Sequence, residues 1–201
     1  MNSTQVIWIR VLLRAIVVAG SGMLVGFVFY QSLIFTPTMK AFQFTVSSVT
    51  AGIAYAALKD LTPRNSFAAL FVWYVVLTGL FVRFDSWLLI LNLVYVAGIA
   101  GAIITYAYVV RKPFVHRVIQ RIMVAGGIIS IANGVIIIAL ALFSPKVMLV
   151  HPASVMEAIS YNVKLGALLG LAIGIGIEVA EYLTRKIAEH KMDIEDVSHA
   201  S

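Results

Sequence analysis

The sequence predicts an all-α integral membrane protein, a bundle of six transmembrane helices that form three helical hairpins. Of its 201 residues, 61% are hydrophobic and only 12% are charged, and the mean hydropathy is +0.98. Ordinary soluble domains are about 45–50% apolar and about 25% charged. Too few polar side chains are present to cover a soluble domain of this size, so we expect lipid to surround much of the surface.

Six apolar segments predict the six spans, since a helix needs about 20 mostly apolar residues to cross a membrane. The first contains the uncharged run Ala15–Phe35, which is longer than the apolar region of about 7–15 residues in a signal peptide. The second and third are short and are expected to cross nearly upright. With their flanking turns, the predicted spans are 11–35, 41–58, 66–82, 86–110, 119–143 and 160–184.

All five prolines fall between the predicted spans, where turns are expected. No predicted span is therefore interrupted in the way that marks the substrate site of many secondary transporters. The first and fifth spans resemble each other, because Arg14 and Arg121 each precede a Val, an Ala-Gly pair and a later Pro at similar spacing. Both an internal duplication and a chance similarity of composition remain open.

The basic residues predict the orientation, because cytoplasmic loops are enriched in Lys and Arg. With the N-terminus inside, eleven basic residues are cytoplasmic and four are external. We therefore expect a multi-pass protein of the cell membrane with both termini in the cytoplasm and a polar cytoplasmic tail over 185–201. The cytoplasmic set is Arg10, Arg14, Lys59, Arg64, Arg111, Lys112, Arg117, Arg121, Arg185, Lys186 and Lys191, and the external set is Lys40, Arg83, Lys146 and Lys164.

Small residues recur at four-residue spacing and form stripes that allow two helix backbones to approach closely. Such stripes pack helices within one bundle, or they face a second copy or another membrane subunit. The stripe of three glycines in the sixth span is the strongest candidate for a partner surface. The predicted packing glycines are Gly22, Gly26, Gly126, Gly134, Gly166, Gly170 and Gly174.

Ionisable and amide side chains near the external face suggest a solute-binding mouth. Arg83 and Asp85 form the second external turn, while Glu157 and Lys164 lie near the start of the sixth span. These groups could bind an anionic or zwitterionic solute, although such side chains also extend to the interface without a function. The amides Asn92 and Asn133 either line a small-solute pocket or form hydrogen bonds between helices.

At the inner face, Glu178 lies within the predicted sixth span and needs a cation to stay ionised. Arg14 and Arg121 lie at equivalent depth in the first and fifth spans. We predict an ion pair of Glu178 with one of these arginines. The pair either locks three helices together or belongs to a proton- or cation-coupled pathway.

Several function classes find no support. The chain has no cysteine, and its four histidines lie in loops or the tail, so neither a metal site nor a cofactor is expected. No phosphate-binding loop or nucleophile motif is present, and we expect no enzymatic activity. The net charge of +6 suits topology and contact with anionic lipid better than nucleic acid.

Two functions remain. The chain is expected to bind or translocate a small solute or ion, alone or as the membrane component of a larger transporter. In topology alone, it resembles the substrate-binding components of energy-coupling-factor transporters. The alternative is a non-catalytic structural subunit of a multi-protein membrane complex.

Overall fold

The computed structural model describes residues 3–29, 37–81, 86–143 and 155–199, and this part of the chain is helical apart from short turns. The predicted all-helical class is confirmed. The helices are α1 (Ser3–Phe29), α2 (Pro37–Asp60), α3 (Pro63–Phe81), α4 (Ser86–Val109), α5 (Val118–Phe143) and α7 (Val155–His199).

Four of these helices are long and apolar enough to cross a membrane. Their candidate spans are Gln5–Val25, Leu89–Val109, Val118–Leu140 and Met156–Glu189. The helices α2 and α3 coincide with the predicted second and third spans. The count of six spans and the cytoplasmic position of the termini stay predictions.

Two of the predicted breaks prove to be helix starts. Pro37 and Pro63 are the first residues of α2 and α3. This position suits proline because N–H groups in the first turn form no hydrogen bond within the helix, so the N–H group that proline lacks is not needed. Thr62 precedes α3, and its hydroxyl accepts a hydrogen bond from the Asn65 amide at 3.4 Å. Only Leu61 and Thr62 separate the two helices, and Asp60 is the last residue of α2.

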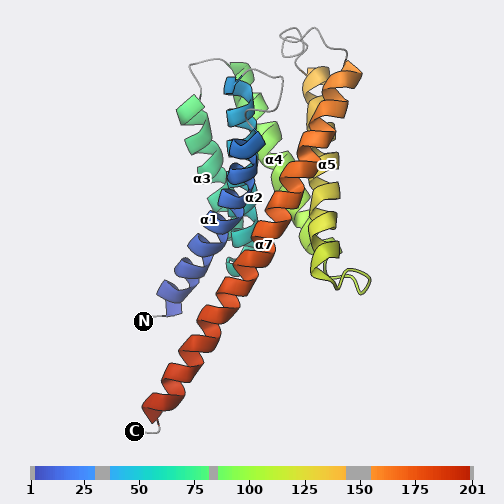
Figure 1. The fold of residues 1–201 in the computed structure, drawn as a ribbon. Coiled ribbons are helices and arrows are strands. Elements are labelled where there is room, and N and C mark those ends of the chain that lie inside the picture. The colour runs from blue at the N-terminus through green and yellow to red at the C-terminus, as the bar shows by residue number, and fades with distance from the viewer. Residues whose placement is uncertain (1–2, 30–36, 82–85, 144–154, 200–201) are drawn as a thin grey trace.

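Five helices form a ring. Going around it, α1 packs on α7, α7 on α5, α5 on α4, α4 on α2, and α2 on α1, while α3 packs outside against α2 and α4. The helix α7 crosses the bundle obliquely and extends beyond the other helices (Figure 1). The start of α1 and the end of α7 lie at the same end of the molecule, which we call the terminal end (Figure 1).

Apolar side chains fill the middle of the ring. Val18, Ile99, Ile129 and Ile173 come from four different helices, and each is 0% exposed. Other large apolar side chains point outward, among them Phe27 at 80% exposed. An outer surface of this kind is unfavourable in water and suits contact with lipid.

The glycine stripe of α7 faces α5. A Cβ atom at Gly170 would lie 2.6 Å from the Ala125 carbonyl oxygen and 2.8 Å from the Gly126 Cα. At Gly166 and Gly174, the nearest atoms of the same helix would lie 2.8 Å and 3.0 Å away. Only glycine allows two backbones to approach to this distance. This stripe is covered within the chain, so it is not free to face another subunit.

The other predicted packing glycines also face neighbouring helices. Gly22 of α1 packs against Ser48 of α2, and a Cβ atom at Gly134 would lie 2.9 Å from Val163 Cγ2. The surroundings of Gly26 lie outside the described residues.

Candidate functional site

The residues of the predicted external mouth are not gathered into a site in the described structure. Arg83 and Asp85 lie outside the described residues. Glu157 and Lys164 are both exposed, near the start of α7 and far from the terminal end.

The two predicted amides lie inside the bundle. Asn92 is 0% exposed, and neither its Nδ2 nor its Oδ1 forms a hydrogen bond with a described residue. Asn133 is 1% exposed and donates a hydrogen bond from Nδ2 to the Ile129 carbonyl at 2.9 Å. The two side chains have the same chemistry and burial, and they differ in hydrogen bonding.

At the terminal end, the predicted ion-pair residues separate into two groups. The Arg121 Nε lies 3.1 Å from Glu178 Oε1. Arg14 turns instead to Glu181, to which its Nε donates a hydrogen bond of 3.0 Å, and to the carboxylate of Asp60. The terminal end therefore holds two arginine–carboxylate groups rather than one pair shared by three helices.

Glu181 is the centre of the larger group. Its Oε1 accepts hydrogen bonds from Arg14 and from the Tyr55 hydroxyl at 2.8 Å, and Lys59 Nζ lies 4.0 Å away. The Arg14 side chain is only 9% exposed. The sequence identifies Tyr55 as a side chain able to form a hydrogen bond between helices, but it does not assign Tyr55 to this group. Asp60 was missed, although it is one of only two acidic residues before Glu157.

The position of α7 between α1 and α5 explains the separation. Residues three apart project from neighbouring faces of a helix. Glu178 consequently points to α5 and Glu181 to α1. Arg14 and Arg121, which begin the two similar sequences, thus hold α7 from opposite sides.

These groups border a cavity of about 450 Å³ at the terminal end, which we call the basic pocket. Its walls come from α1, α2, α4, α5 and α7 and from Arg111, which follows α4. Six lining side chains are cationic and two are anionic, and the Asp60 carboxylate that pairs with Arg14 brings the net charge of the cluster to three positive charges. The cations are Arg10, Arg14, Lys59, Arg111, Arg121 and Arg185, and the anions are Glu178 and Glu181.

Half of the cations are not neutralised by a carboxylate. Arg10, Arg111 and Arg185 form no ion pair with any described residue. The Arg10 Nε is also buried and has no hydrogen-bond partner among the described residues. A buried charged donor without an acceptor is unfavourable, and an anion in the pocket would relieve it.

No protein-family model, curated protein or solved structure matches this chain.

The cationic side chains of the basic pocket suit an anionic ligand. Guanidinium groups bind carboxylates and phosphates through paired, charge-assisted hydrogen bonds. The volume lies within the range of about 300–1,000 Å³ that is typical of small-molecule sites. The described residues contain no group of three or more His, Asp or Glu side chains that could hold a metal ion.

Proposed function

We propose that this chain binds a small anionic solute in the basic pocket and translocates it, alone or as the membrane component of a larger transporter. The observation that carries the proposal is the excess of six lining cations over two carboxylates in a cavity of about 450 Å³.

The surroundings of the pocket support a gated site. Toward the middle of the bundle, the ring is filled by the fully buried side chains of Ile99, Ile103 and Ile173. An anion that enters at the terminal end therefore meets an apolar barrier. Passage requires the helices around this barrier to move apart.

The two ion pairs supply a means of coupling binding to such a movement. An anion in the pocket competes with Glu181 for Arg14 and with Glu178 for Arg121. When these contacts weaken, α7 is held less firmly to α1 and α5. A ligand can shift a conformational equilibrium only through such a difference in contacts between the two states.

Pyrophosphate binding to the detergent-solubilised protein tests the first half of the proposal. A ligand at about 100 times its Kd stabilises the folded state by about 2.7 kcal/mol, so the thermal midpoint should rise. Arg185→Gln should weaken binding about tenfold because it removes one charged donor. Lys186→Gln is the matched control, since Lys186 is the exposed neighbour and does not line the pocket.

Uptake of radiolabelled pyrophosphate into proteoliposomes tests translocation. We expect uptake by the wild type and by Lys186→Gln, and reduced uptake by Arg185→Gln. If pyrophosphate neither shifts the midpoint nor accumulates, the anion-binding proposal is wrong.

One observation favours the structural-subunit alternative. The helix α7 has 45 residues and projects past the bundle (Figure 1), and its surface there carries the exposed ion pair Lys186–Glu189. A projecting polar helix can dock another subunit. Purification from native membranes in mild detergent would then yield a stable complex, and the isolated chain would bind no anion.

A further inference from the structure

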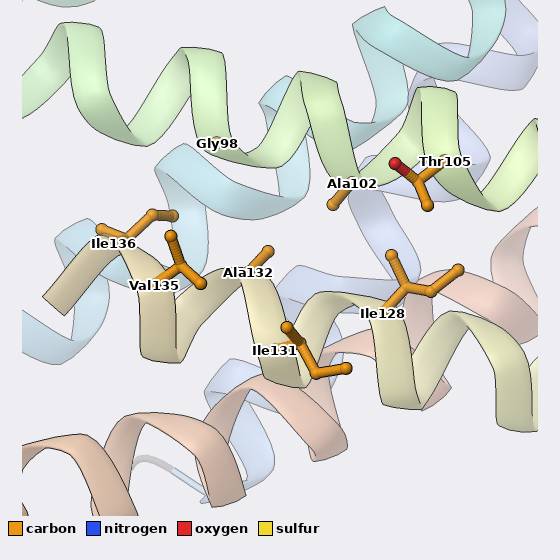
Figure 2. A pocket seen from close by; sticks show the side chains of 8 residues that line it. All are labelled: Gly98, Ala102, Thr105, Ile128, Ile131, Ala132, Val135 and Ile136. Atoms are coloured by element: carbon orange, nitrogen blue, oxygen red, sulfur yellow. The ribbon is translucent and has the colours of Figure 1, made fainter. Parts of the chain in front are cut away.

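A second cavity lies on the bundle between α4 and α5, and Figure 2 shows the side chains that line it. We call it the apolar groove. Its volume is about 290 Å³. The lining side chains include Ile128, Ala132 and Val135 of α5, which face Ala102 and Thr105 of α4 (Figure 2).

Thr105 carries the one hydroxyl among the residues that line the groove, and this hydroxyl is already hydrogen-bonded. Thr105 Oγ1 donates a hydrogen bond of 2.9 Å to the Gly101 carbonyl of its own helix. The groove lies within the candidate membrane spans Leu89–Val109 and Val118–Leu140. The groove therefore suits a hydrocarbon chain.

The groove and the basic pocket follow the same two helix faces. On α4, Ala102 of the groove and Tyr106 of the pocket are four residues apart, which places them on one face. On α5, Ile128 of the groove and Arg121 of the pocket are seven residues apart, which is two turns along one face. At 1.5 Å per residue, the two sites are separated by roughly 6–10 Å along the helices.

We propose that the anionic ligand of the basic pocket is a membrane phospholipid with a net negative charge, whose acyl chain lies in the apolar groove. The inference rests on the proposed anion site and names its ligand class. The arginines bind the headgroup phosphate near the membrane surface, while α4 and α5 hold the chain beside them.

The two parts of the site contribute differently. A lipid chain gains little from leaving other lipid chains, because both surroundings are apolar. Affinity therefore comes mainly from the headgroup and the guanidinium groups. The groove adds dispersion contacts that favour an attached chain over a soluble phosphate compound.

The test titrates phosphatidic acid into the detergent-solubilised protein and counts bound lipid by native mass spectrometry. Phosphatidylcholine is the comparison, because it carries a phosphate but has no net charge. Ala132→Phe fills the groove and should weaken phosphatidic acid binding roughly fivefold, because it removes carbon–carbon contacts. It should leave pyrophosphate binding unchanged. Ala68→Phe is the matched control, since Ala68 is exposed on α3 and lies outside the groove.

Val135→Phe provides a second groove variant that should fold, because Val135 is 58% exposed. Arg185→Gln should weaken both phosphatidic acid and pyrophosphate about tenfold.

The outcomes separate the two proposals. If pyrophosphate binds but both groove variants retain phosphatidic acid as the wild type does, the lipid inference is overturned and the anion site stands. Equal binding of phosphatidic acid and phosphatidylcholine also overturns the inference. If neither pyrophosphate nor phosphatidic acid binds, both proposals fail.

Discussion

Arg14 and Glu181 are 167 residues apart in the chain, and a hydrogen bond of 3.0 Å joins the Nε of one to the Oε1 of the other. Asp60 binds the same guanidinium, so one side chain links α1, α2 and α7 at the terminal end. This contact both closes the bundle and forms part of the wall of the basic pocket.

Arg14→Ala is expected to lower the free energy of unfolding by about 3 kcal/mol, because the substitution leaves the largely buried carboxylate of Asp60 without its cation. The measurement is thermal or denaturant unfolding in detergent. Lys186→Ala is the control, since it breaks an exposed pair with Glu189 and should change stability by less than about 1 kcal/mol. Equal effects of the two substitutions would show that the Arg14 contacts do not stabilise the bundle.

Gly170→Ala is expected to lower stability by about 1–3 kcal/mol, because the new Cβ would force α7 away from the α5 backbone. Gly127→Ala makes the same chemical change on α5, where a Cβ atom meets nothing within 4 Å, and should be tolerated. Unfolding of both variants in the same detergent gives the comparison. A tolerated Gly170→Ala would contradict the close α5–α7 contact.

Asn92→Leu is expected to raise stability by about 1–2 kcal/mol, because it replaces a buried amide that forms no hydrogen bond among the described residues. Asn133→Leu should instead destabilise the protein, because it removes the donor to the Ile129 carbonyl. Thermal midpoints of the two variants provide the test, and a fall in both would indicate a partner for Asn92. Loss of uptake in a stabilised Asn92→Leu variant would place this amide on the solute path.

Single-cysteine labelling is expected to place the two regions of the terminal end on one side of the membrane. The chain has no cysteine, so each introduced thiol reports alone. His116→Cys, in the α4–α5 connection, and Lys186→Cys should react with a membrane-impermeant maleimide only after the cells are permeabilised. Met156→Cys, at the start of α7, should react in intact cells. The reverse pattern would overturn the predicted orientation, and labelling of all three from one side would overturn the topology.

Local properties of the sequence were enough to predict the all-helical fold and the ends of α4 and α5, but not that α7 runs from Val155 to His199. The length of an apolar segment, its lack of charged residues and the positions of prolines are properties of that segment alone. They can be read from the sequence without knowing which other segments pack against it. The glycine spacing of α7 likewise indicated a close helix contact, and the position of Glu178 indicated an arginine partner at the inner face.

Tertiary structure decided which segments meet. The pairing of Glu178 with Arg121 and of Glu181 with Arg14 depends on α7 lying between α5 and α1, and no local pattern encodes the order of helices in the ring. Asp60 and Tyr55 join the site only because α2 ends beside α1 and α7. The basic pocket and the apolar groove are spaces between helices, and their shape follows from backbone approach and side-chain packing between residues far apart in the chain.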